Sequence, residues 1–250
     1  MKFEVKDVTK DTVRVTTQDE RWYIRTVKGR TGIPEILYLP SITWIASHMP
    51  KGVEFYKWLA SKGWDEAQAI KETAGARGSK VHAAIEILLK EGEFSFNEQV
   101  MNPNTGQLEE LTADEYECVV AFLSWYQRYK PEILGVEEVF FNEKRGYAGT
   151  IDIRCIIDGK PCIVDVKTSK EIHKDYLVQL GGHKMHYDTD ELDHSIYVLQ
   201  VGYRKNKNKY KFTELPYRPD LFDIAYKLWE EEHTGNGPLQ REFPIKLTLA

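Results

Sequence analysis

Two aspartates and a lysine near the middle of the chain are of residue types, and at a spacing, that could form a catalytic site. Asp152 ends the run Gly149-Thr150-Ile151-Asp152, and thirteen residues later the chain reads Asp165-Val166-Lys167. Two carboxylates and an ammonium group on one surface are the equipment for metal-assisted hydrolysis of a phosphodiester. Whether they meet depends on the elements that carry them.

The segment between the two motifs predicts a tight β-hairpin. Asp158-Gly159 favours a two-residue turn in which both residues take positive φ. β-branched residues on either side predict strands over 148–157 and 161–168. With this turn as the loop, Asp152 lies opposite Asp165 in a non-hydrogen-bonded pair, with Cα atoms about 4.5 Å apart. Lys167 then projects from the same face as Asp165.

The placement of two negative charges opposite each other needs an explanation. Two carboxylates at that spacing repel by roughly 3–4 kcal/mol at an effective dielectric near 20, and opposed like charges destabilise a sheet. A divalent cation with oxygen ligands would relieve the repulsion. The alternative is an exposed hairpin that carries these charges on its solvent-exposed face. Ile163 on the charged face, with Val164 and Val166 on the other, favours a partly buried strand instead.

Four further polar residues are candidates for the same site. His82 and Glu86 lie at i and i+4 on a predicted helix, where they form a surface ion pair or His82 serves as a metal ligand. Glu138, on the strand before Asp152, is a candidate outer acid. Gln179 could orient a water or a base edge from the helix after Lys167.

The remaining sequence predicts one domain without a dividing linker. The expected elements are two or three strands over 1–28, a loop over 29–40, helices over 41–48, 52–61 and 65–91 with a break near 75–78, a loop over 93–111, a helix over 112–130 with a capping-box start at Thr112, a strand over 136–143, a helix over 174–188, a hairpin of strands over 195–204 and 208–215, a helix over 218–233 and an extended tail over 234–250.

Composition limits the classes of protein. The chain has 250 residues, 42% of them hydrophobic, and a net charge of −5. We expect no membrane partner, because no stretch approaches the roughly 20 apolar residues of a span. The first residues lack an apolar signal core, so we expect a cytoplasmic protein, in the host cytoplasm if a phage encodes it. Cys155 and Cys162 should face each other as buried thiols. The basic run 204–211 predicts either a solvated hairpin tip or a phosphate contact.

The order of these motifs resembles a known family. His82 on an early helix, Gly-Thr-Ile-Asp152, Asp165-Val-Lys167 and then Gln179 resemble the RecB-like branch of the PD-(D/E)XK nucleases. Leu39-Pro40-Ser41-Ile42-Thr43-Trp44 and Arg77-Gly78-x-x-Val81-His82 look like the N-terminal half of phage-borne members and of mitochondrial genome-maintenance exonucleases. The resemblance covers roughly residues 39–187.

The resemblance implies a fold and a set of roles. It implies an α/β fold with a restriction-endonuclease-like core, a central mixed sheet flanked by helices over 131–216. Strands over 1–38, a helical part over 39–130 and a C-terminal helix and tail over 217–250 complete a single nuclease domain. Mg²⁺ or Mn²⁺ would be held by four residues: His82, Asp152, Asp165 and the Val166 carbonyl. Lys167 would position or activate the attacking water and stabilise charge on the phosphate, and Gln179 would support the site.

The chain departs from the family pattern in one motif. Where the last motif has Tyr, this chain has His183, with Tyr187 one turn later. Three cysteines, two of them in core strands, exclude the iron–sulfur cluster of some relatives.

We therefore expect a metal-dependent deoxyribonuclease, with an exonuclease in recombination, repair or replication as the first reading. The rivals are a structure- or sequence-specific endonuclease and a DNA-binding subunit without turnover. DNA is the expected partner, with a recombination or replication protein as a further one; the oligomeric state is left open. The residues expected to contact DNA are Arg77, Lys80, Thr168, Lys205, Lys207 and Lys209.

Overall fold

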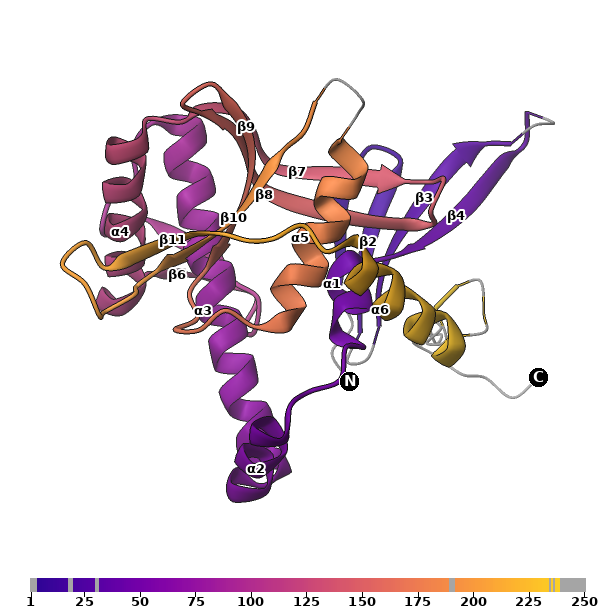
Figure 1. Cartoon of the computed structure of the whole chain (residues 1–250), viewed down its shortest axis with the longest axis horizontal. Coiled ribbons are helices and arrows are strands. Elements are labelled where there is room, and N and C mark those ends of the chain that lie inside the picture. Colours follow the sequence, from indigo (N-terminus) through magenta and orange to yellow (C-terminus); the bar gives the residue numbers. More distant parts are fainter. Residues whose placement is uncertain are drawn as a thin grey trace, which may run out of the picture.

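The protein has a mixed α/β architecture, built from helices and from more than one sheet (Figure 1). The computed structural model describes residues 4–17, 20–29, 32–188, 192–233, 235 and 237–238. Most of the tail for which we expected an extended arm lies outside these residues. Among the described helices we find none with the length and apolar character that a membrane crossing requires.

The largest sheet has five strands and lies at the centre of the molecule (Figure 1). Its order is β11-β10-β9-β8-β7. The strands are β7 (Glu132–Asn142), β8 (Tyr147–Ile157), β9 (Lys160–Lys167), β10 (Ser195–Val201) and β11 (Tyr210–Glu214). β9 and β10 pair in parallel, whereas the other neighbours are antiparallel. The parallel pair requires a crossover, which α5 (Lys174–Tyr187) provides.

The predicted hairpin register is confirmed from the turn as far as Ile153 and Val164, but the predicted cross-strand pair of Asp152 with Asp165 is not part of the paired ladder. Ile157 pairs with Lys160, Cys155 with Cys162 and Ile153 with Val164. Asp158 and Gly159 both have positive φ, 49° and 76°, as the tight turn requires. The hairpin predicted through the basic run is also confirmed, because β10 pairs with β11.

Helices cover both faces of this sheet. On one face α3 (Trp64–Glu91) and α4 (Ala113–Tyr129) bury apolar side chains, such as Val81 and Phe122, against Ile153 and Val164. On the other face α1 (Ile42–Ser47), α5 and α6 (Pro219–Glu232) pack around Ile163 and Val198. The predicted capping box of α4 is confirmed: Thr112 accepts from the Glu115 N–H, and Glu115 accepts from the Thr112 N–H.

A second sheet of four strands forms the N-terminal part of the chain. Its strands, in sheet order, are β1 (Glu4–Thr9), β2 (Thr12–Thr16), β3 (Arg21–Lys28) and β4 (Pro34–Pro40). The expected loop over 29–40 was wrong, because β4 pairs with β3 along its whole length. Its prolines lie at the first and last residues of the strand, on the edge of the sheet, where a missing N–H costs least. A bridge from Ser41 to Ala148 joins this part to β8.

Two other expectations were wrong. α3 runs without a break through Gly75 and Gly78, because its flanking turns supply enough helical hydrogen bonds and packing to carry both glycines. The expected loop over 93–111 contains a hairpin of β5 (Gln99–Asn102) and β6 (Gln107–Glu110), which packs against α3 through Val100. The predicted helix over 52–61 corresponds to α2 (Val53–Lys62).

Candidate metal centre

Asp152 lies where β8 and β9 part. Their backbone pairing runs from the turn as far as Ile153 and Val164. At the next position the Oδ2 atom of Asp152 accepts a hydrogen bond of 2.7 Å from the Val166 N–H. The carboxylate thus replaces a backbone acceptor of the ladder, which fixes its orientation and leaves Oδ1 for another partner.

Glu137 approaches the same point from β7. Val136 pairs with Ile153 and Glu138 with Ile151, so Glu137 lies opposite Asp152 in the register. Its φ of 49° is in the left-handed region, which is uncommon for a residue other than glycine. Strained backbone of this kind concentrates at functional sites, and here it occurs at a carboxylate that lies beside Asp152.

His82 brings an imidazole to these carboxylates from α3. Its Nε2 atom lies 2.9 Å from the Val166 carbonyl oxygen, which can only accept, so Nε2 carries the hydrogen. Its Nδ1 atom lies 3.4 Å from Oε1 of Glu137 and 3.6 Å from Oδ1 of Asp152. One ligand atom from each of these three residues lies within 4.8 Å of the others. We call His82, Glu137 and Asp152 the carboxylate–imidazole group.

The electrostatics of the group favour a cation. Burial disfavours the charged imidazole, but the carboxylates of Asp152 and Glu137 outweigh it and raise the pKa of His82 to about 9. Burial raises the pKa of Asp152, against the opposing charges of His82 and Lys167. Without a metal the imidazolium proton is therefore the positive charge between the two carboxylates.

Asp165 and Lys167 form a buried ion pair beside the group. Asp165 is 1% exposed, and the Lys167 Nζ atom lies 2.9 Å from its Oδ1 and 2.7 Å from its Oδ2. Burial raises the pKa of Asp165 to about 6 although Lys167 opposes the shift. The pKa of Lys167 is also raised, since Asp165 and Asp152 together outweigh its own burial. The ammonium lies 5.0 Å from the ring centroid of Tyr176.

The predicted ligand set is thus only partly brought together. His82 and Asp152 are in the carboxylate–imidazole group, whereas Asp165 faces Lys167. The Val166 carbonyl accepts from His82, so it supports the imidazole and fixes its tautomer rather than pointing to an empty ligand position.

The predicted supporting residues lie apart from the group. Glu138 forms a two-point ion pair with Arg154 at 2.9 and 3.2 Å, because it projects from the opposite face of β7 to Glu137. Tyr187 lies against the same Arg154, whose guanidinium carbon is 5.2 Å from the ring centroid. Glu86 pairs with Lys90 and not with His82. Gln179 is half-buried on α5 and makes no hydrogen bond to the described residues of the site.

The predicted DNA contacts divide into accessible and occupied residues. Lys80 was a wrong prediction: its side chain is 8% exposed and pairs with Glu115 at 2.8 Å inside the α3–α4 interface. Arg77 pairs with Asp114 at 2.6 Å and donates to the Thr168 carbonyl at 3.2 Å. Lys209 pairs with Glu117 of α4 at 3.1 Å.

Lys205 and Lys207 remain exposed at the tip between β10 and β11. Neither makes an ion pair with a residue in the described part of the chain, so both ammonium groups are available to a phosphate backbone.

Sequence reasoning missed two residues, Glu137 and Tyr176. Glu137 and Glu138 are adjacent acids that project from opposite faces of β7, and the local sequence does not show which of them faces His82. Tyr176 lies in the first turn of α5, three residues after the N-cap His173, and its approach to Lys167 depends on the path of the intervening loop.

The donor set of the carboxylate–imidazole group fits a divalent cation. Two carboxylates and an imidazole suit Mn²⁺, and Mg²⁺ with its preference for oxygen would rely on the carboxylates and on water. Neither a family model nor a curated protein matches the chain in sequence.

Proposed function

We propose that this protein is a metal-dependent nuclease that hydrolyses phosphodiester bonds in DNA, on a restriction-endonuclease-like core. The observation that carries the proposal is the meeting of His82, Glu137 and Asp152 at the point where β8 and β9 part, beside the Asp165–Lys167 pair. Two carboxylates, an imidazole and a held ammonium group match the needs of phosphodiester hydrolysis.

Each residue has a task that follows from its contacts. Asp152 and Glu137 supply oxygen ligands and His82 supplies Nδ1 once its proton is lost, because a ligand nitrogen must be unprotonated. Val166 orients Asp152 through its N–H and His82 through its carbonyl. When bound, Mg²⁺ or Mn²⁺ supplies Lewis acidity and a water of lowered pKa. Asp165 holds the Lys167 ammonium, which stabilises negative charge that grows on the phosphate.

The variants that test the site best are two neighbouring acids. Glu137→Gln removes a carboxylate from the carboxylate–imidazole group and should lower cleavage of DNA by about a hundredfold or more, as loss of a charge-stabilising group does. Glu138→Gln removes the partner of Arg154 instead and should retain most activity. Initial rates on end-labelled DNA with Mg²⁺ or Mn²⁺ measure both, and thermal melting confirms that each variant folds.

Asp152→Asn and Lys167→Met should each abolish cleavage in the same assay, and EDTA should stop the wild-type reaction until Mg²⁺ or Mn²⁺ is restored. Full activity of folded Asp152→Asn would refute the site. Equal losses in Glu137→Gln and Glu138→Gln would show that the acid beside His82 has no special part.

The substrate separates the candidate classes. An exonuclease degrades linear DNA and leaves closed circles intact, an endonuclease cuts both, and a binding subunit retains DNA in a mobility-shift assay without cutting it. We propose the exonuclease as the leading form, on the resemblance of the motifs alone. End-labelled linear and circular DNAs, single- and double-stranded, incubated with Mg²⁺ distinguish the three.

A further inference from the structure

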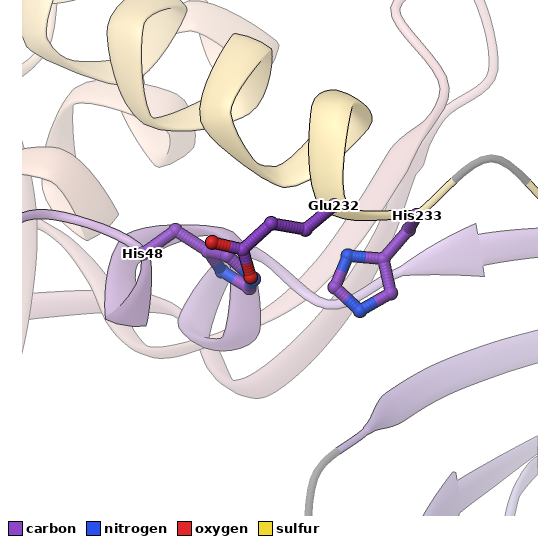
Figure 2. A group of neighbouring side chains, drawn as sticks. All are labelled: His48, Glu232 and His233. Atoms are coloured by element: carbon purple, nitrogen blue, oxygen red, sulfur yellow. The ribbon is translucent and has the colours of Figure 1, made fainter.

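A second group of metal-ligating side chains lies away from the carboxylate–imidazole group. It consists of His48, the residue that ends α1, with Glu232 and His233 at the end of α6. Figure 2 shows the Glu232 carboxylate against the ring of His48, with the ring of His233 beside them. One ligand atom from each residue lies within 4.8 Å of the other two.

Both imidazoles have one nitrogen committed to the backbone. Nδ1 of His48 lies 2.8 Å from the Trp44 carbonyl oxygen, and Nδ1 of His233 lies 2.9 Å from that of Trp229. A carbonyl only accepts, so each Nδ1 carries the hydrogen and each Nε2 keeps its lone pair. This is the arrangement that supports histidine ligands of zinc, in which the second ring nitrogen donates to a carbonyl.

The distances suit a small tetrahedral ion. Nε2 of His48 lies 3.4 Å from Oε2 of Glu232. Two ligands at tetrahedral angles, each about 2.0–2.2 Å from Zn²⁺, lie about 3.4 Å apart. The ligand atom of His233 lies within 4.8 Å of the other two, and the Glu232 side chain, which is 68% exposed, is the ligand that can adjust to share an ion with both imidazoles.

Aromatic rings hold the two imidazoles in place. The His233 ring stacks on Trp229 with an interplanar angle of 9°, and its centroid lies 4.5 Å from that of Trp44. Trp22 packs edge-on against both indoles from β3. Ligands whose rotamers are locked by packing lose little entropy when they bind an ion.

An ion held there would keep an open side. His48 and Glu232 line a cavity of about 630 Å³ between the N-terminal sheet, α1 and α3. Three protein ligands and one position open to solvent are typical of accessible zinc sites, in contrast to closed four-ligand sites. Two imidazoles and one carboxylate also favour Zn²⁺ over Mg²⁺, which prefers oxygen.

We infer that His48, Glu232 and His233 bind a Zn²⁺ ion that joins the end of α6 to the end of α1. The simpler role of the histidines is to satisfy carbonyls of the last helical turns. That role uses Nδ1 alone, and it explains neither the Glu232 carboxylate at Nε2 of His48 nor the convergence of two helix ends. The site is independent of the proposed nuclease function.

Calorimetric titration of the full chain with Zn²⁺ tests the inference. The titrations use an Asp152→Asn background, which weakens the other candidate site. We expect one zinc bound per chain, and a rise in melting temperature that Mg²⁺ does not produce.

The matched variants are adjacent acids. Glu232→Gln should weaken zinc binding at least about tenfold, whereas Glu231→Gln, a neighbouring exposed acid, should bind as the parent does. His48→Ala and His233→Ala should abolish both the heat of binding and the melting shift, while His173→Ala, an exposed histidine elsewhere, should keep them. Absence of zinc binding by the parent, or equal affinity of Glu232→Gln and Glu231→Gln, would overturn the inference.

Discussion

At the scale of single residues, His183 is a side chain whose burial has a consequence for stability. It is 1% exposed, and neither ring nitrogen has a hydrogen-bond partner among the described residues. Burial, helped by the positive charges of Lys167 and His186, lowers the pKa of His183 to about 3. The native state therefore holds this imidazole neutral at pH values where the unfolded chain protonates it.

The free energy of unfolding should carry a pH dependence from this residue. Because the unfolded chain takes up a proton below about pH 6.5 that native His183 refuses, stability falls as pH drops from about 6.5 towards 3. Between pH 7 and 4.5 the loss is about 2–3 kcal/mol. His183→Leu should remove that part of the slope in denaturant titrations at several pH values.

His173→Leu is the control, since His173 is exposed and should leave the slope unchanged. Comparison of each variant with the parent cancels the contribution of Asp165, whose raised pKa acts in the opposite direction. Parallel pH profiles for His183→Leu and the parent would mean that His183 titrates normally in the native state.

At the scale of elements, two helical glycines should respond to alanine in opposite directions. A Cβ atom at Gly182 of α5 would lie 2.3 Å from Cδ1 of Ile42 and 2.8 Å from the Phe222 ring, whereas a Cβ at Gly75 of α3 would meet no atom within 4 Å. Gly182→Ala should lower the free energy of unfolding by about 1–3 kcal/mol through overpacking. Gly75→Ala should raise it by about 0.5–1 kcal/mol. Urea titrations of both variants measure the difference. A Gly182→Ala variant as stable as the parent would mean that α1 and α6 can shift to make room for the added methyl group.

The loop between β10 and β11 should contribute to DNA affinity through Lys205 and Lys207, which pair with no acid among the residues that the structure describes. Lys205→Ala with Lys207→Ala should weaken DNA binding and reduce the slope of log affinity against log salt by about two, since two phosphate contacts are lost. Lys57→Ala with Lys62→Ala on α2 removes the same charge where Glu54 and Glu66 already pair with it. Equal salt slopes for the two double variants would mean that the loop is a solvated hairpin tip without phosphate contacts.

How far the sequence predicts this protein also depends on scale. The turn at Asp158-Gly159 determines the register of β8 and β9 as far as Ile153 and Val164, so that part of the sheet could be predicted locally. The approach of Glu137 to the site could not, because nothing in the sequence marks the left-handed backbone of this residue. β4 was missed because Pro34 and Pro40 resemble loop residues, although as the end residues of an edge strand they cost little.

At the scale of the whole molecule, long-range packing decides which predicted residues meet. The helix that carries His82 also carries Lys80, but the two side chains project in different directions. α4 covers the side of α3 on which Lys80 lies, where Glu115 pairs with it. Helical periodicity indicates that both residues are near a core edge, but it does not indicate that an acid from a distant helix occupies one of them. The position of Asp165 beside Lys167, outside the carboxylate–imidazole group, is of the same kind.

The three cysteine thiols are buried in the folded molecule, which limits their reactivity. Cys155 and Cys162 oppose each other inside the sheet, Cys118 is a buried residue of α4, and burial raises the pKa of all three, that of Cys155 to about 12. A thiol held protonated and away from solvent is a poor nucleophile. Oxidants and alkylating reagents should therefore react with these thiols only after the sheet and its helices separate. Cysteine modification in this chain would thus report unfolding and not a function of the native state.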